Sequence, residues 1–206
     1  MKFIDIKLKF NNNDILDIRN IINIFGPLDR RRLYEWQKKN YIKKITNNYY
    51  IFSETEIDES ILQTAANRIY SPSYVGLESA LSFYGFIPET VFQITSITTK
   101  KTKRLNTAIA NFSYKYIHKR LFWGYIIKKI NEHTFFISDP EKTILDYLYY
   151  NPQLINTLDF TELRLNKREI KKVLKPEKIK KYLTIFAKNK LTESANRLMG
   201  FLNVRL

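Results

Sequence analysis

The sequence has no cysteine and few glycines or histidines, and each shortage excludes a class of chemistry. Without cysteine, the chain cannot form disulfides, thiolate nucleophiles or cysteine-based zinc sites. The five glycines, at positions 26, 76, 85, 124 and 200, are too far apart for a phosphate-cradling loop or a dinucleotide fingerprint. His118 and His133 do not form a helical pair of metal ligands. We therefore expect a protein without a bound metal or cofactor, and not an enzyme.

Long hydrophobic runs are also missing. No apolar run approaches the roughly 20 residues that a membrane-spanning helix needs, and no signal-type apolar region follows the first residues. The chain of 206 residues is nevertheless 44% hydrophobic and 15% aromatic, which is enough for a packed core. These features predict a folded cytoplasmic protein that has no membrane partner.

Acidic residues are too few to balance the basic ones. The chain has 35 Lys plus Arg against 20 Asp plus Glu, for a net charge of +15 and a pI of about 9.8. This excess predicts a polyanionic partner, and nucleic acid is favoured over a membrane because no basic amphipathic helix dominates the sequence. The alternative is a composition that simply favours Lys, Ile and Asn, in which case the charge has no partner.

The first 55 residues have the pattern of a small helical unit that ends in a hairpin. Residues 2–10 alternate apolar and charged and predict a short strand, with a first helix as the alternative. Asn13 is expected to cap a helix that runs from Asp14 to about Phe25, before the Gly-Pro pair breaks it. A second helix is predicted over 29–39.

Two β-rich runs, 41–46 and 49–52, follow and are joined by Asn47 and Asn48, which suit a tight turn. The order helix, turn, helix, hairpin is typical of a winged helix-turn-helix, whose second helix enters the DNA major groove while the hairpin lies beside the backbone. We therefore predict a winged-helix DNA-binding domain over residues 1–55.

The charges of this unit agree with that prediction. Residues 27–52 hold seven Lys or Arg against two acidic residues, a net charge of +5. Leu33 and Trp36 share the apolar face of the second helix, so its basic residues should point outward. The expected base contacts are Arg31, Tyr34 and Gln37, and the expected phosphate contacts are Arg30, Lys38, Lys39, Lys43 and Lys44.

An acidic cluster at 54–59 marks a change of composition, and we predict a second, α+β domain over 60–206. Ser71 as N-cap, Pro72 in the first turn and Gly85 after the end predict a helix over 71–84. Residues 90–138 favour an antiparallel sheet, because the connections are too short for crossover helices. Further helices are expected over 139–150 and within 167–202.

Asp139, Glu141 and Lys142 are the residue types that a metal-dependent nuclease uses. Ser-Asp-Pro-Glu-Lys is explained more simply as a helix start, in which acidic side chains meet the positive end of the helix dipole. Nuclease activity is therefore the weakest of the alternatives.

Three blocks of the sequence resemble the AbiEi family, the antitoxin and transcriptional-regulator component of type IV toxin–antitoxin (abortive infection) systems. The blocks are Leu-Tyr-Glu-Trp-Gln-Lys-Lys from 33, the run from Ala66 through Tyr-Ser-Pro-Ser-Tyr to Glu89, and Pro-Glu-Lys-Thr-Ile-Leu-Asp-Tyr-Leu from 140. Within them, the residues that we assign to the structural motif are Trp36, Ser71, Pro72, Tyr74, Glu78, Gly85, Glu141 and Asp146.

The resemblance implies a winged helix that binds promoter DNA with inverted repeats, and a second domain that neutralises a nucleotidyltransferase-like toxin. It implies no catalysis. Because a single DNA-binding module binds weakly, we expect a homodimer or two copies on an inverted repeat. The alternative is a module that does not bind DNA, whose basic C-terminal helices bind an acidic protein or RNA.

Overall fold

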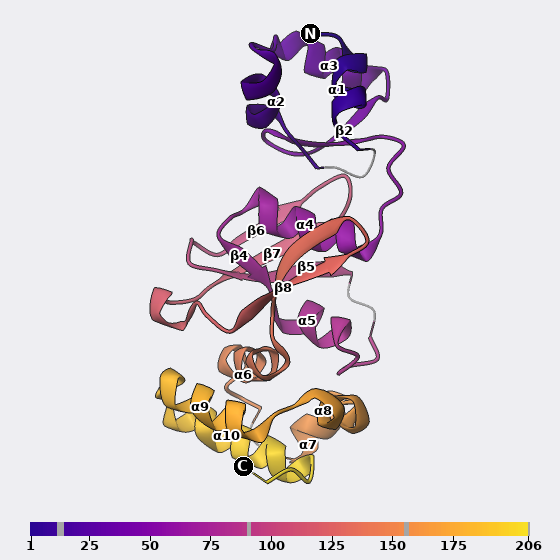
Figure 1. The fold of residues 1–206 in the computed structure, drawn as a ribbon. Coiled ribbons are helices and arrows are strands. Elements are labelled where there is room, and N and C mark those ends of the chain that lie inside the picture. Colours follow the sequence, from indigo (N-terminus) through magenta and orange to yellow (C-terminus); the bar gives the residue numbers. More distant parts are fainter. Residues whose placement is uncertain (12–14, 90–91, 155–156, 206) are drawn as a thin grey trace.

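The computed structural model describes residues 1–11, 15–89, 92–154 and 157–205. Three layers follow one another along the long axis of the molecule (Figure 1): an N-terminal unit, a sheet with helices on its faces, and a group of C-terminal helices. The fold class is α+β, as predicted. Within the described residues, no helix is both long and apolar enough to cross a membrane.

The N-terminal unit comprises residues 1–52. Its elements are α1 (Phe3–Lys9), β1 (Leu16–Asp17), α2 (Ile18–Phe25), α3 (Arg30–Lys38), β2 (Ile42–Thr46) and β3 (Tyr49–Phe52). The three strands form an antiparallel sheet in the order β1-β3-β2. The hairpin was therefore predicted correctly. Asn48 has a φ of +68°, and Asn40, in the turn before β2, has a φ of +54°.

The strand predicted over residues 2–10 is wrong, because this segment is helix α1. Phe3, Ile6 and Phe10 recur at helical spacing and pack into the N-terminal core, whereas Ile4 and Leu8 are exposed. The sequence therefore carries an alternating and a helical pattern together, and burial follows the helical one.

Helix α2 is shorter than predicted. It begins at Ile18, and the carboxylate of Asp17 accepts a hydrogen bond from the Arg19 N–H at its first turn. Leu16 and Asp17 form β1 because they pair with Tyr50 and Tyr49 of the hairpin. The predicted cap Asn13 and first residue Asp14 lie outside the described residues.

The larger sheet has six strands in the order β6-β7-β5-β4-β9-β8. They are β4 (Ser73–Val75), β5 (Gln93–Thr98), β6 (Lys103–Asn106), β7 (Asn111–Tyr116), β8 (Tyr125–Ile130) and β9 (His133–Ser138). The prediction of an antiparallel sheet is correct for the pairs β4–β5, β6–β7 and β8–β9. Because β5 pairs with β7 and β4 with β9 in parallel, the sheet as a whole is mixed. Instead of a crossover helix, β6 connects β5 to β7 and pairs with the outer side of β7.

The helix predicted over 71–84 is also wrong at its start. Ser71 and Pro72 are exposed and do not cap a helix, and residues 73–75 form the central strand β4, paired with β5 and β9. Helix α5 (Leu77–Phe83) begins only after Gly76, where an added Cβ would lie 3.0 Å from the Ile97 side chain. The predicted end is correct, because Gly85 follows with a φ of +66°.

Helices cover both faces of the six-stranded sheet. Helix α4 (Glu59–Ile69) shares a buried cluster with Ile94, Phe112 and Tyr114, whereas α5 packs on the opposite face with Ile97. Helix α6 (Pro140–Tyr150) lies between the sheet and the C-terminal helices (Figure 1). These are α7 (Thr157–Glu162), which was not predicted, α8 (Lys167–Val173), α9 (Pro176–Phe186) and α10 (Asn189–Phe201).

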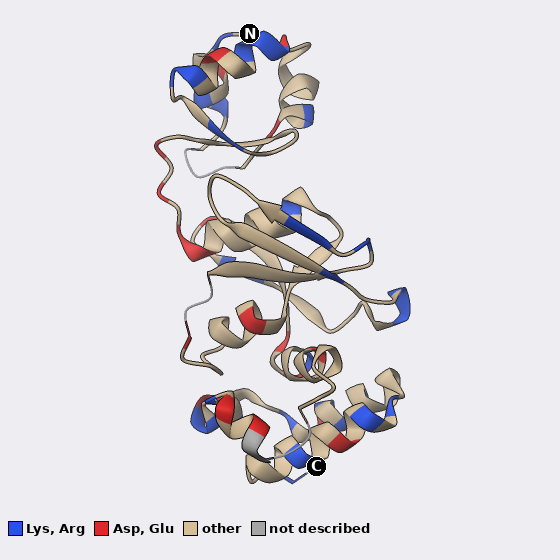
Figure 2. Cartoon of the chain, turned by 180° about the vertical axis from the view of Figure 1, so that it is seen from behind, with Lys and Arg blue, Asp and Glu red and all other residues tan. Residues whose placement is uncertain are grey.

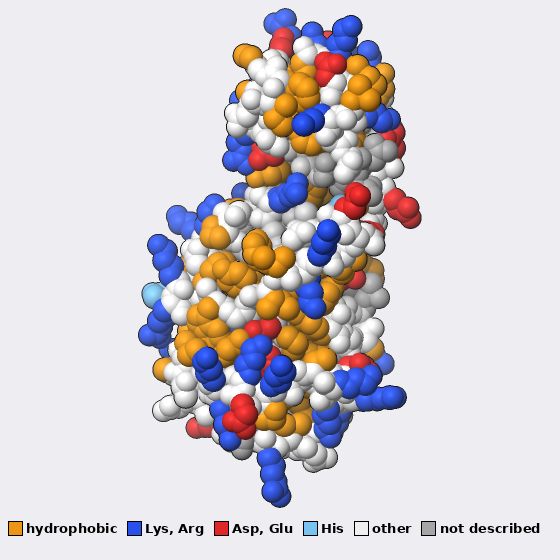
Figure 3. Space-filling view, viewed as in Figure 1, with side chains coloured by type: hydrophobic (Ala, Val, Ile, Leu, Met, Phe, Trp, Pro, Cys, Tyr) orange, Lys and Arg blue, Asp and Glu red, His pale blue; other side chains and the backbone are white. Residues whose placement is uncertain are grey.

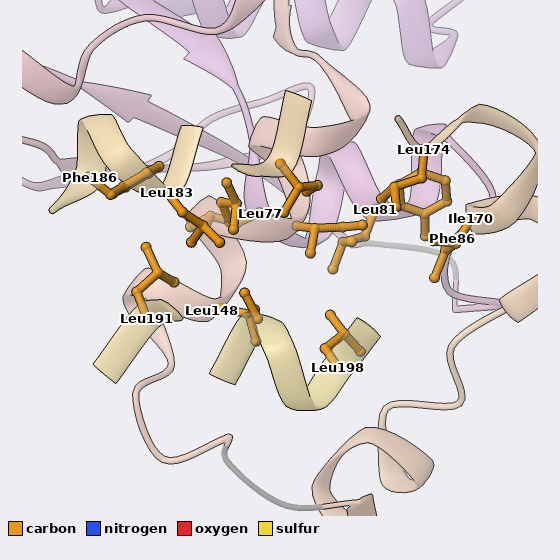
Figure 4. Close-up of a cluster of buried hydrophobic side chains, with 14 of the residues drawn as sticks. Leu77, Leu81, Phe86, Leu148, Ile170, Leu174, Leu183, Phe186, Leu191 and Leu198 are labelled. Atoms are coloured by element: carbon orange, nitrogen blue, oxygen red, sulfur yellow. The ribbon is translucent and has the colours of Figure 1, made fainter. Parts of the chain in front are cut away.

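One hydrophobic cluster joins α5 and α6 to α8, α9 and α10. Figure 4 shows Leu77 and Leu81 of α5 and Leu148 of α6 facing Leu183, Phe186 and Leu198 of the last two helices. The helices predicted over 139–150 and within 167–202 are confirmed, and their apolar faces are buried here.

Candidate nucleic-acid interface

Two buried side chains fix the orientation of α3. Leu33 and Trp36 are only 9% and 7% exposed and belong to the N-terminal core, and the ring centroids of Trp36 and Phe3 are 5.5 Å apart. Asp29 caps the helix, because its carboxylate accepts a hydrogen bond from the Arg31 N–H at 2.9 Å. The opposite face of α3 is therefore turned to solvent.

The structure separates the three predicted base contacts. Arg31 and Tyr34 are exposed, and Tyr34 is 69% exposed. Gln37 is half-buried, and its side-chain Nε2 donates a hydrogen bond to the Leu33 carbonyl at 3.0 Å. Arg31 and Tyr34 can reach a ligand directly, whereas Gln37 would first have to leave its own helix backbone.

A groove of about 460 Å³ brings some of the predicted residues together. It runs between α2, α3 and the turn of the β2–β3 hairpin, and Arg30, Tyr34, Gln37 and Lys44 line it together with Asn48. The other predicted contacts are also on the surface but outside this groove: Arg31, Lys38, Lys39 and Lys43.

The predicted phosphate contacts are all exposed: Arg30, Lys38, Lys39, Lys43 and Lys44. Across the described part of the chain, no carboxylate forms an ion pair with them. Arg32, which is not among the predicted DNA contacts, donates a hydrogen bond to the carbonyl of Met1. Figure 2 shows Lys and Arg segments on the helices and strands of the N-terminal unit, with acidic residues in the segment that leaves it.

The other charged cluster is buried at α6. Lys142 and Asp146 are fully buried, and the Lys142 Nζ donates to the Asp146 Oδ1. The Tyr74 hydroxyl donates to the Asp146 Oδ2 at 2.8 Å and lies 3.1 Å from the Lys142 Nζ. Burial lowers the pKa of Lys142 and raises the pKa of Asp146, whereas the contact between them opposes both shifts.

Aromatic rings surround the Lys142 ammonium. The Nζ lies 5.0 Å from the ring centroid of Trp123 and 4.9 Å from that of Phe186. Gly124 makes room for the lysine stem, because an added Cβ there would be 3.0 Å from its Cγ. The signal for this pair in the sequence is the i, i+4 spacing of Lys142 and Asp146, but that spacing is usual for exposed pairs too.

The acidic start of α6 connects it to α9. Asp139 caps α6 by accepting from the Lys142 N–H, and its Oδ2 also accepts from the Tyr182 hydroxyl at 2.7 Å. Glu141, 1% exposed, accepts from the Lys175 N–H and from the Lys178 Nζ, both at 2.8 Å. These carboxylates therefore hold the C-terminal helices in place.

The remaining residues of the structural motif occupy separate positions. Tyr74 is buried but lies on strand β4 instead of a helix, and Glu78 is half-buried in the first turn of α5. Ser71 and Pro72 lie at the rim of a cleft. In the described residues, no three His, Asp or Glu side chains gather where they could hold a metal ion.

No protein-family model matches the chain, and no curated protein matches it.

Proposed function

We propose that this protein is a DNA-binding transcriptional autoregulator and the antitoxin of a nucleotidyltransferase-like toxin. The observation that carries the DNA-binding part is the combination of topology and charge in the N-terminal unit. The elements of this unit follow one another as a helix, a strand, two helices and a hairpin, and β1 pairs with β3. This is the order of elements in a winged helix. On this proposal α3 is the recognition helix and the β2–β3 hairpin is the wing.

The charge distribution supports the same orientation. Arg31 and Tyr34 are exposed on the face of α3 that is opposite Leu33 and Trp36, so they can reach base edges. Arg30 and Lys44 line one groove together with residues of the hairpin turn, so both cations are available to phosphates beside α3. Because these cations have no carboxylate partner among the described residues, binding DNA breaks no ion pair.

The antitoxin part rests on the resemblance of the sequence to the AbiEi family. On this proposal, the six-stranded sheet with α4–α10 contacts the toxin. The partner DNA is the protein's own promoter, with two copies or a homodimer on an inverted repeat.

DNA binding is tested by the salt dependence of affinity for the promoter of the protein's own operon. If six phosphates are neutralised, the logarithm of the association constant falls with the logarithm of salt concentration at a slope of about −5. The variant Arg31→Ala/Tyr34→Ala/Lys38→Ala is expected to abolish specific binding. A matched control is Lys171→Ala/Lys172→Ala on α8, which removes surface charge far from α3 and should leave specific binding unchanged.

A slope near zero, or equal binding by the α3 variant and the wild type, would contradict the DNA-binding proposal. The antitoxin proposal is tested separately, by co-expression with the product of the adjacent reading frame. Rescue of growth by this protein, retained in the α3 variant, is the expected result; no rescue would refute it.

A further inference from the structure

A cleft of about 720 Å³ lies between the N-terminal unit and the six-stranded sheet. Asp17, Asn20 and Tyr49 line its N-terminal side, and the opposite side includes Asn67 and Arg68 of α4. Tyr125 of β8 and Phe136 of β9 line the same cleft. Its volume is within the range of about 300–1,000 Å³ that is usual for small-molecule sites.

The two sides of the cleft are held together by a packed interface. Ile15, Ile45 and Ile51 of the N-terminal unit are buried in the same cluster as Ile61 and Ala65 of α4. Beside this cluster, the Arg68 Nη1 donates a hydrogen bond to the Ile15 carbonyl at 3.1 Å. The cleft is therefore bounded by packed walls and can present a defined shape to a ligand.

One wall offers aromatic rings. Tyr125 and Phe136 are 36% and 42% exposed, although they lie on paired strands of the sheet. The Tyr125 ring stacks on buried Tyr74, with centroids 5.1 Å apart and an angle of 20° between the planes. Hydrophobic side chains are visible at the surface of this central layer in Figure 3. Exposed aromatic rings with fixed backing are suited to stacking with a planar heterocycle.

The same cleft has a polar group without a partner. Asn67 is 9% exposed, and its Oδ1 accepts a hydrogen bond from the Phe136 N–H at 2.5 Å. Its Nδ2 is buried and has no hydrogen-bond partner among the described residues. An unpaired buried amide costs free energy, so a movement of this side chain that brings its Nδ2 to an acceptor of a ligand, such as a ring nitrogen or carbonyl, would be favoured.

The lining of the cleft holds one cation, Arg68, and one acidic residue, Asp17. Arg68 is exposed and, in its bond to Ile15, uses one of the five N–H donors of a guanidinium group. Asp17, the acidic residue of the lining, is paired with Arg19 through an Nη2–Oδ2 distance of 2.6 Å. A phosphate near Arg68 would therefore meet a carboxylate whose charge is already partly compensated by Arg19.

We propose that this cleft binds a free mononucleotide, whose base stacks on Phe136 and whose phosphate pairs with Arg68. The Tyr125 ring is at 86° to that of Phe136, so it would contact the base at an angle instead of stacking on it. The amide of Asn67 contributes a hydrogen bond to the base. This site is separate from the face of α3, and its occupancy does not depend on DNA or toxin binding.

The test is calorimetric titration of the full chain, without DNA, with AMP, GMP, CMP and UMP one at a time and then with the matching nucleosides. We expect saturable binding of at least one nucleotide at a ratio of one per chain, and binding of its nucleoside weaker by about tenfold or more because the phosphate is missing. Phe136→Leu, which keeps apolar volume without a ring, should weaken binding by about tenfold, the loss of one stacking contact.

Arg68→Ala should lower affinity for the nucleotide to that for the nucleoside. The matched controls are Tyr116→Ala and Arg104→Ala, which remove an exposed ring and an exposed cation from other strands and should bind as the wild type does. Circular dichroism of each variant checks that it is folded, and Arg68→Lys, which keeps the charge, should retain part of the affinity if Arg68→Ala fails to fold.

The proposal is overturned if none of the four nucleotides binds saturably, or if Phe136→Leu and Arg68→Ala bind as the wild type does. Equal weakening by Tyr116→Ala and Arg104→Ala would also overturn it, because binding would then follow exposed rings and surface charge in general instead of this cleft. If a short single-stranded oligonucleotide binds more tightly than any mononucleotide, the proposal of a small-molecule site is wrong and the cleft is part of a surface that binds single strands. None of these results bears on the salt dependence of promoter binding, so the two proposals can fail independently.

Discussion

The cations on the exposed surface of α3 differ from those beside α6 in whether they are paired with carboxylates. Arg30, Arg31 and Lys38 are exposed and have no carboxylate partner among the described residues, whereas Lys142 is fully buried against Asp146 and Lys178 contacts two carboxylates. Exposed cations without partners contribute little to stability and remain available to a polyanion. Buried, paired cations hold elements together, and their removal leaves a charge without compensation. The net charge of +15 therefore does not by itself indicate how many cations are available to a polyanion. That number depends on which cations the structure leaves without a carboxylate partner.

The largest expected effect is at the buried pair. Asp146→Ala leaves the Lys142 ammonium buried without its anion, and we expect a loss of about 3–5 kcal/mol in the free energy of unfolding. Urea denaturation followed by circular dichroism measures this. The double variant Lys142→Met/Asp146→Leu replaces both charges with apolar groups and should recover most of the loss. A change below about 1 kcal/mol in Asp146→Ala would show that the pair is not a stabilising element.

The next test concerns the N-terminal unit. Trp36→Ala removes the largest side chain from the core under α3 and should cost about 3–5 kcal/mol. Tyr34→Ala, on the exposed face of the same helix, should change stability by no more than about 0.5 kcal/mol while weakening DNA binding. Thermal unfolding and promoter binding, measured on both variants, separate the two faces. Equal destabilisation by the two variants would contradict the orientation of α3.

The smallest expected effect is an alkaline loss of stability at the α6–α9 contact. Burial and the hydrogen bond to Asp139 raise the pKa of Tyr182 to about 12. Burial alone would lower the pKa of Lys178, but its bonds to Glu141 and Asp139 outweigh burial and raise it. Both folded-state values exceed the unfolded ones, so the folded state keeps protons that the unfolded chain loses above pH of about 10.

The stabilisation from both groups is therefore fully present below a pH of about 10 and declines as the pH rises above it. The contribution of Tyr182 is lost near pH 12, whereas that of Lys178 is lost only in part by then. Urea unfolding at intervals from pH 8 to 12 should show this decline, and Tyr182→Phe should make it shallower. Tyr116→Phe, on an exposed tyrosine of β7, is the control and should leave the slope unchanged. An identical decline in Tyr182→Phe and the wild type would exclude a contribution of Tyr182.

Local signals in the sequence determined several elements. Asp139 before Pro-Glu and Gly85 after an apolar stripe predicted one boundary each of α6 and α5, because caps act on the backbone next to them. The helix predicted over 29–39 matches α3, which the structure shows to be capped by Asp29. The outward orientation of Arg31 and Tyr34 also followed from the sequence, since Leu33 and Trp36 are only three residues apart and must share the buried face of one helix.

Only the tertiary structure decided the features that depend on distant partners. Residues 73–75 follow a good capping sequence, but pairing with β5 and β9 on both sides makes them a strand. Likewise, the central position of β4 and the parallel pairs of the sheet depend on which strands meet, and no local pattern encodes that. Lys142 is a residue type that is almost always exposed, and it is buried here because Asp146, Tyr74 and two aromatic rings from separate elements converge on its ammonium.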